Sequence, residues 1–242
     1  ANVPVVIHES DVTPGLANKL ALPFASHMFT IFDQTLKYLP NDKATCTGSI
    51  VREQLFQGDK ERGMKLCGFE ENKKTLLVMG GSLGSVVLND ALRSNLPELL
   101  MEFNIIHLCG KGNVDHTLDS LKGYKQFDYV TTELSDLLYT ADFVVSRAGS
   151  NSIFEFLALK KPMLLIPLSA TKSRGDQILN ARIFEKQGFA LTLEEELLTK
   201  NTFMKSIQNL VKKKDEIIDA MIKAESPKTP SEMVELILQY EK

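Results

Sequence analysis

The sequence is poor in cysteine and has no long apolar run. Its three cysteines, Cys46, Cys67 and Cys109, are odd in number, and no two are close enough for a CxxC metal or redox site. This usage fits a reducing, cytosolic compartment. No apolar stretch approaches the roughly 18–20 residues that span a bilayer, and no signal peptide is visible. We therefore expect a cytoplasmic protein without a membrane-spanning helix.

An excess of positive charge is also missing, since the net charge is −3 over 242 residues. Without a basic surface, the sequence gives no indication of nucleic-acid binding. The composition, 43% hydrophobic and 24% charged, is that of a globular protein. The length suits one large domain or one and a half. Because the chain starts at Ala1 and enters an apolar stretch almost at once, we expect a fragment of a longer protein.

Short apolar runs alternate with helical patterns along the chain. Several runs are continuously apolar, which is typical of parallel strands covered on both faces. The alternation predicts a doubly wound α/β sheet. A hydroxyl followed by proline at Thr13-Pro14 indicates a helix start. Strands are expected at 3–8, 28–32, 75–79, 105–109, 128–130, 143–146, 163–167 and 189–193, and further helices at 134–141, 152–160, 177–187, 202–223 and 230–241.

A glycine-rich turn follows the expected strand 75–79 and opens a helix, with glycines at Gly80, Gly81 and Gly84. Glycines let a backbone approach a ligand, and a helix N-terminus attracts a phosphate or pyrophosphate. The spacing is not G-x-G-x-x-G, and no acidic residue follows the next strand at the position for a cofactor ribose, so NAD binding is disfavoured. No P-loop motif is present. A plain tight turn remains the alternative.

A second strand-to-helix turn, at 146–155, contains Ser150, Asn151, Ser152 and Glu155. Ser152-x-x-Glu155 matches a capping box, and the spacing alone favours that structural interpretation. The functional alternative is that Glu155 accepts hydrogen bonds from a ribose diol.

A third polar turn, at 173–181, carries Asp176 and Gln177, which could bind sugar hydroxyls. The alternative is an N-cap aspartate beside a solvent-facing glutamine. All three turns follow carboxyl ends of expected strands, the edge at which doubly wound sheets bind ligands. The residues therefore predict an α/β domain for a phosphorylated, hydroxyl-rich ligand, without naming the reaction.

These three segments resemble the MurG family of N-acetylglucosaminyltransferases, which build peptidoglycan. Two upstream elements agree, His8-Glu9-Ser10-Asp11 through Lys19 and Thr47 through Arg52, so the likeness covers nearly the whole chain. Many relatives have Gln-Asn where this chain has Ser10-Asp11. The resemblance implies a GT-B fold: a doubly wound, Rossmann-like donor domain plus a remnant of an N-terminal Rossmann-like acceptor domain. A turn-like polar cluster at 40–43 also predicts a domain junction near residues 45–52. We therefore expect a remnant (1–48), the donor domain (49–226) and a C-terminal helix (227–242).

The resemblance also implies a role for each matching residue. Ser82 with Gly81 and Gly84 would contact the diphosphate of UDP, and Arg52 would neutralise it. Glu155 would bind the ribose, and backbone near Val130 and Thr131 the uracil. Residues contacting the sugar or phosphates would be Ser150, Asn151, Ser152, Asp176, Gln177 and Asp11, with Glu9 as a catalytic group facing the cleft.

The implied reaction is inverting transfer of N-acetylglucosamine from UDP-N-acetylglucosamine to the C4 hydroxyl of undecaprenyl-pyrophosphoryl-muramoyl-pentapeptide. We expect neither metal nor cofactor. The acceptor would bind through the missing domain, at the cytoplasmic membrane surface, so this chain is expected to bind donor but to transfer poorly. Two alternatives stay open, a UDP-sugar 2-epimerase on the same scaffold and a non-catalytic UDP-sugar-binding module.

Overall fold

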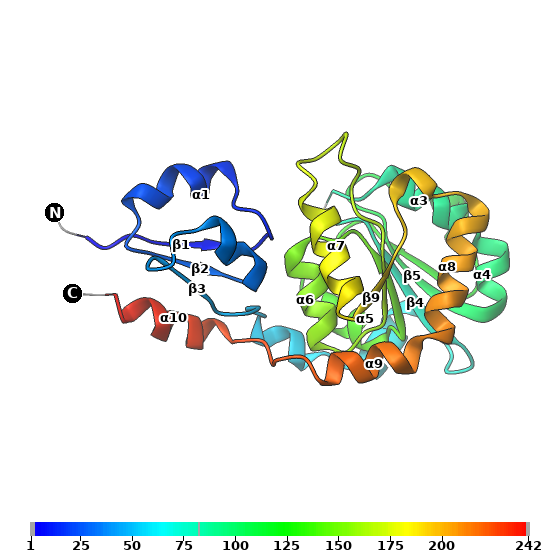
Figure 1. The fold of residues 1–242 in the computed structure, drawn as a ribbon. Coiled ribbons are helices and arrows are strands. Elements are labelled where there is room, and N and C mark those ends of the chain that lie inside the picture. The colour runs from blue at the N-terminus through cyan, green and yellow to red at the C-terminus, as the bar shows by residue number, and fades with distance from the viewer. Residues whose placement is uncertain (1–2, 82, 241–242) are drawn as a thin grey trace.

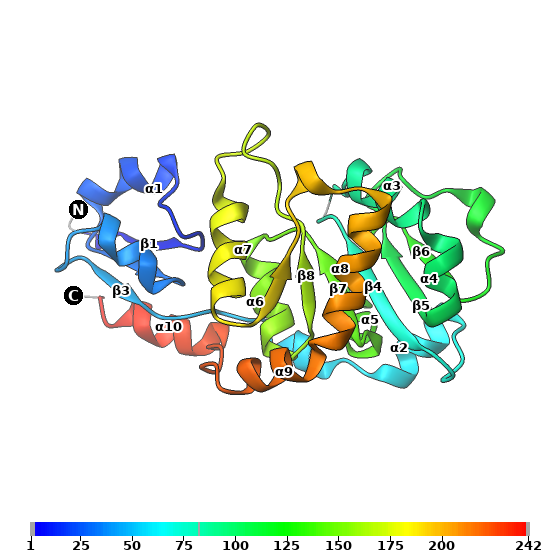
Figure 2. The same cartoon turned by 45° about the vertical axis from the view of Figure 1, so that its right-hand side comes forward.

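The computed structural model describes residues 3–81 and 83–240. The chain folds around two parallel β-sheets. The first sheet has the order β1-β2-β3, with β1 at Val6–Glu9, β2 at His27–Thr30 and β3 at Ala44–Cys46. The second has the order β6-β5-β4-β7-β8-β9. Its strands are β4 (Lys74–Met79), β5 (Phe103–Leu108), β6 (Tyr124–Phe127), β7 (Phe143–Ser146), β8 (Met163–Leu165) and β9 (Ala190–Thr192). Figure 2 shows the two sheets side by side.

The order of the larger sheet creates a topological switch point between β4 and β7. The chain leaves β4 toward β5 on one side and leaves β7 toward β8 on the other. The connecting loops therefore diverge at the carboxyl ends of these two strands, and a crevice opens there.

Helices cover both faces of the six-stranded sheet. Figure 1 shows α3, α4 and α8 on one side and α6 and α7 on the other. The helices are α1 (Leu16–Ala21), α2 (Lys60–Cys67), α3 (Val86–Arg93), α4 (Leu96–Glu102), α5 (Leu134–Thr140), α6 (Ser150–Ala158), α7 (Asp176–Lys186), α8 (Lys200–Lys212), α9 (Lys214–Ile222) and α10 (Pro230–Leu238). Short 3-10 helices lie at Leu22–Phe24, Asp33–Tyr38, Glu53–Gln57, His116–Leu118 and Glu195–Leu197.

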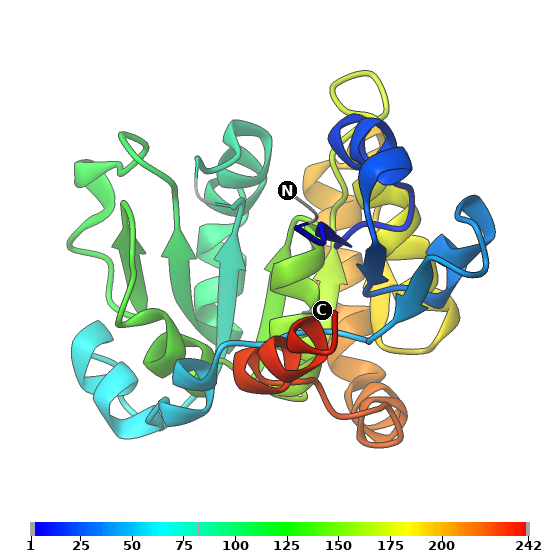
Figure 3. The ribbon, with the colours of Figure 1, turned by 90° about the vertical axis from the view of Figure 1, so that its left-hand side faces the viewer.

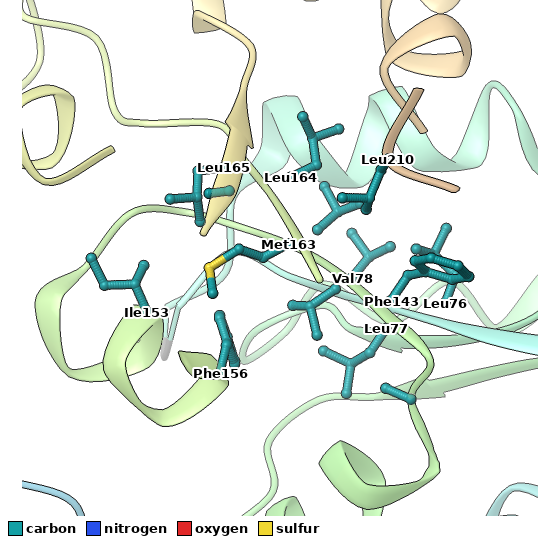
Figure 4. Close-up of a cluster of buried hydrophobic side chains, with 14 of the residues drawn as sticks. Leu76, Leu77, Val78, Phe143, Ile153, Phe156, Met163, Leu164, Leu165 and Leu210 are labelled. Carbon is teal, nitrogen blue, oxygen red and sulfur yellow. The ribbon is translucent and has the colours of Figure 1, made fainter. Parts of the chain in front are cut away.

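Burial on both faces explains why the central strands are continuously apolar. Leu76, Leu77 and Val78 of β4 are all fully buried, although neighbouring side chains of a strand point to opposite faces. Figure 4 shows the strand side chains between Phe156 of α6 and Leu210 of α8. This core fixes the strand ends that carry the crevice.

The polypeptide passes twice between the two sheets, and the two crossings pair with each other. Lys228 donates its N–H to the carbonyl of Ser49 at 2.7 Å, and Val51 donates to the carbonyl of Lys228 at 3.0 Å. After this bridge, α10 returns to the small sheet, as Figure 3 shows. There Tyr240 stacks on His27 with ring centroids 4.7 Å apart. The C-terminal helix therefore packs against the sheet formed by the first part of the chain.

The doubly wound α/β fold and the expected strand 143–146 are confirmed. Expected strands at 3–8, 28–32, 75–79, 105–109, 163–167 and 189–193 correspond to β1, β2, β4, β5, β8 and β9 with shifted ends. The strand expected at 128–130 is wrong, because the strand there is β6, which ends at Phe127. As an edge strand with exposed residues, β6 lacks the continuous apolar pattern of the centre.

Two expected helix starts are also wrong. The helix expected from Thr13-Pro14 begins at Leu16 with Gly15 at its N-cap, because Thr13 is engaged elsewhere. The capping box at Ser152-x-x-Glu155 does not form, since the helix begins at Ser150 with Gly149 as N-cap. In the described part of the chain, no helix has the length and apolar character needed to cross a bilayer.

Candidate functional site

The glycine turn after β4 forms one wall of the switch-point crevice. Gly84 has φ +77°, and a Cβ there would lie 2.0 Å from the carbonyl oxygen of Cys109. Gly110, with φ +85°, packs against Gly84 from the end of β5. Gly81 also has a positive φ, but a Cβ on it would meet nothing within 4 Å. Gly84 is therefore needed for close backbone packing, whereas Gly81 faces open space. Ser82 lies outside the described residues.

The N-terminus of α6 forms the opposite wall, at the end of β7. No side chain caps it, its N-cap is Gly149, and its first turn contains no acidic residue. The first N–H groups of a helix have no intrahelical partner and carry partial positive charge. This end of α6 therefore offers N–H donors suited to a phosphate.

A cavity of about 430 Å³ lies at the carboxyl ends of β4, β5 and β6. It brings together the predicted site residues Arg52, Gly81 and Thr131, and also Val130. It adds residues that the sequence did not single out, because they are apolar or loop positions without a motif: Gln54, Leu55, Met79, Leu108, Gly110, Asp128, Tyr129, Thr132, Leu134 and Ser135. Its lining combines apolar and polar residues, which suits a flat heterocycle with polar edges.

Glu155 lies one turn into α6 and pairs with the guanidinium of Arg52. Arg52 Nε donates to Glu155 Oε1 at 2.8 Å. Burial raises the pKa of the Glu155 carboxyl, and the charge and hydrogen bond of Arg52 oppose that shift. The pair joins two predicted residues that lie 103 positions apart in the sequence.

A second cavity, of about 360 Å³, lies between the N-terminus of α6, the start of α7 and the first sheet's loop. Six predicted site residues line it together with Gly149 and Ser173: Asp11, Ser150, Asn151, Ser152, Asp176 and Gln177. The structure therefore brings the second and third sequence motifs to one pocket, with an upstream residue facing them.

Gln177 and Asp176 hold the α7 side of this pocket. The Gln177 Oε1 accepts the Leu168 N–H at 3.0 Å, which fixes the amide. One oxygen of Asp176 accepts from Thr13 Oγ1 at 3.0 Å, and the other lies 2.7 Å from Arg174. Since α7 begins at Asp176 after Gly175, Asp176 is not the N-cap, and that alternative is wrong.

Asp11 connects the first sheet's loop to the large domain. Its Oδ1 accepts from Asn180 Nδ2 at 3.2 Å, and Arg174 lies 3.9 Å from its Oδ2. Burial raises the pKa of Asp11, and repulsion from Asp176 and Glu9 adds to the rise. A carboxyl group in this position can accept hydrogen bonds from hydroxyl groups of a ligand.

Glu9 supports the loop that carries Asp11. Its Oε1 accepts the Asp11 N–H at 3.0 Å, and its Oε2 accepts from the Gly15 N–H at 2.7 Å and from Asn18 Nδ2 at 2.9 Å. Glu9 is 5% exposed and is not among the lining residues of either cavity. The contacts therefore suit a residue that positions Asp11, and its predicted catalytic role stays a prediction.

Arg147 is a site residue whose role the sequence did not reveal. Its guanidinium is buried, donates to the carbonyls of Ile166 and Pro167, and bonds the Ser85 hydroxyl at 2.7 Å. It also pairs with Glu195. Because Ser85 is the N-cap of α3, Arg147 ties the two walls of the crevice together. No local pattern marks these partners, which come from distant segments.

A buried polar network lies under the first cavity. His107 on β5 is fully buried, with Nε2 2.9 Å from Asn89 Oδ1 and Nδ1 2.8 Å from the Tyr124 hydroxyl. Asn89 in turn donates to the carbonyl of Cys109, beside Gly84. Burial lowers the pKa of His107 to about 3. A neutral ring therefore donates from Nε2 to Asn89 and accepts from Tyr124 at Nδ1.

Within residues 3–81 and 83–240, no cluster of three or more His, Cys, Asp or Glu could hold a metal ion.

The model of the Glycosyltransferase family 28 C-terminal domain matches residues 75–236. A Clostridium botulinum protein (strain Alaska E43) named UDP-N-acetylglucosamine--N-acetylmuramyl-(pentapeptide) pyrophosphoryl-undecaprenol N-acetylglucosamine transferase is 52% identical over 237 residues, 98% of this chain and 66% of that protein. Its namesake from strain Langeland is 50% identical over 240 residues, 99% of this chain and 68% of that protein. The chain belongs to the MurG family.

The crystal structure of Acinetobacter baumannii MurG superposes with a TM-score of 0.72 over 98% of this chain and 67% of that chain, at 22% sequence identity. The likeness places the present MurG-family chain in the GT-B fold. This chain spans about two thirds of the length of the curated relatives that it matches.

Proposed function

We propose that this chain binds UDP-N-acetylglucosamine and carries the donor side of N-acetylglucosamine transfer to undecaprenyl-pyrophosphoryl-muramoyl-pentapeptide. The supporting observation is the presence of the uncapped α6 N-terminus and two cavities along the carboxyl edge of the sheet of a MurG-family domain. The names of the relatives support the donor, the acceptor and the group transferred. Because the undecaprenyl chain of the acceptor is a lipid, we expect the transfer to take place at the cytoplasmic membrane surface.

In this proposal the uracil enters the first cavity, against the backbone of Val130 and Thr131. The ribose diol donates to Glu155, and the diphosphate lies at the N-terminus of α6. The sugar occupies the second cavity, where the Asp176 and Asp11 carboxylates accept from its hydroxyls and the Gln177 amide N–H groups donate to them. Gly81 leaves open space for the phosphates to approach the backbone, and Gly84 keeps the turn packed against the end of β5.

The reaction is a displacement at the anomeric carbon by the C4 hydroxyl of the acceptor, with inversion. The new glycosidic bond forms as the bond to the UDP oxygen breaks, and the hydroxyl proton leaves to a base. Negative charge grows on the departing diphosphate. The N–H groups at the start of α6 are fixed donors for that charge, and such preorganised donors stabilise a transition state. The Arg52 guanidinium adds a positive charge once its side chain turns from Glu155 to the diphosphate.

Calorimetry with UDP, UDP-N-acetylglucosamine and NADH tests the donor assignment. We expect both UDP compounds to bind and NADH not to bind. Glu155→Gln keeps the shape of the side chain but removes its charge, so UDP should bind about tenfold more weakly or worse. Glu102→Gln, on the exposed end of α4, is the matched control and should leave UDP binding unchanged. Binding of NADH without UDP would refute the proposal.

Because the relatives are longer, we also expect negligible transfer by this chain alone. Release of UDP in the presence of the lipid-linked acceptor measures it. Robust turnover by the 242 residues would contradict this part of the proposal and leave the donor assignment intact.

A further inference from the structure

Arg52 is hydrogen-bonded to the Glu155 carboxylate, the group to which the proposed function assigns the ribose. The Arg52 side chain is 48% exposed and Arg52 lines the first cavity, while the Glu155 side chain is only 14% exposed. Their hydrogen bond, from Nε to Oε1, is charge-assisted. Any diol that donates to Glu155 must therefore displace Arg52 or share the carboxylate with it.

We propose that Arg52 is a diphosphate-dependent latch on Glu155, which disfavours nucleosides and favours ligands that carry a diphosphate. The inference rests on the proposed function, because it requires the ribose at Glu155. A nucleoside that displaces Arg52 gives the guanidinium no new partner. A nucleoside diphosphate supplies one, because the proposed function puts its phosphates at the N-terminus of α6, the helix that carries Glu155.

The backbone around the pair lets the cation move while the anion stays in place. Val51, directly before Arg52, is 2% exposed, and its N–H is held by the Lys228 carbonyl at 3.0 Å. The half-exposed Arg52 side chain extends from this fixed point. Glu155 sits within α6, whose neighbours Ile153 and Phe156 are fully buried. The latch therefore opens by rotation of one long side chain, without a shift of the sheet or the helix.

The latch predicts opposite effects of one substitution on two ligands. In Arg52→Ala, UDP should bind about 10- to 100-fold more weakly, because a hydrogen-bonded charge at the diphosphate is lost. Uridine should bind about two- to fivefold more tightly, since it no longer competes with a partly exposed ion pair. Calorimetry measures UDP, and ligand-observed NMR titration to millimolar concentrations measures uridine.

Arg182→Ala is the matched control, because it removes an exposed arginine from α7 whose nearest acidic partner is Glu194 at 3.9 Å. Neither ligand should respond to it. If Arg52→Ala leaves uridine unchanged, undetectable or weaker while native protein binds UDP, the latch is refuted and the proposed function stands. If native protein fails to bind UDP, the proposed function itself fails.

Discussion

Acidification from pH 7 to pH 5 should destabilise this protein through His107. The imidazole is fully buried between Asn89 and Tyr124, and its pKa falls from 6.5 to about 3 because burial penalises the charged ring. In the unfolded chain the ring is exposed and takes up a proton near its ordinary pKa. Between the two pKa values the unfolded state binds more protons than the native state, so stability is present above pH 6.5 and is lost as the pH falls toward 3.

The size of the effect follows from the two pKa values. Each pH unit well inside that window changes the free energy of unfolding by about 1.4 kcal/mol, so the loss between pH 7 and pH 5 is about 2 kcal/mol. For a chain of this length, that corresponds to a fall in Tm of roughly 4–8 °C.

Other groups titrate in the same range, so the assay compares variants. His107→Gln keeps a donor and an acceptor but cannot take up a proton, and it should be less stable at pH 7 yet lose about 2 kcal/mol less on going to pH 5. His116→Gln, on an exposed side chain, should follow the native protein. Urea unfolding at each pH gives the free energies. Parallel losses in native protein and His107→Gln would refute the assignment of the pH dependence to this ring.

Three further predictions concern the frame of the site. Gly84→Ala should lower the free energy of unfolding by at least about 1–2 kcal/mol because of its positive φ alone, and further because the new Cβ overlaps the Cys109 carbonyl. Gly81→Ala should show only the backbone cost, because the surroundings of Gly81 are open. Equal losses for the two variants in urea unfolding would contradict this. Phe156→Ala should destabilise by about 3–5 kcal/mol, because it empties a fully buried position between α6 and the sheet, and a loss below 1 kcal/mol in the same assay would oppose it. Tyr240→Ala removes aromatic contacts worth about 0.5–1.5 kcal/mol that hold α10 on the small sheet. Amide hydrogen exchange in α10 should therefore become about two- to tenfold faster, while exchange in the six-stranded sheet stays the same. Unchanged exchange in α10 would argue against this docking.

Some of the site could be predicted because the signals are local. Each of the glycine turn at Gly81 and Gly84, the α6 start at Ser150 and the α7 start at Asp176 combines a buried strand with a polar or glycine-rich helix entry. In a doubly wound sheet such entries share one edge, so their convergence followed from the pattern alone. The capping box at Ser152 failed because the same four letters fit a helix that begins two residues earlier, and only the backbone decides between them.

The alternation of strands and helices could be predicted from the residues alone, because burial of parallel strands and amphipathic helices produces a hydrophobic pattern among neighbouring residues. Which distant side chains meet depends on the three-dimensional arrangement of these elements. Arg52 meets Glu155, Thr13 meets Asp176 and Arg147 meets Glu195 across long stretches of chain. Such pairings depend on strand order and on the paired crossings between the two sheets, and no local periodicity records either of them.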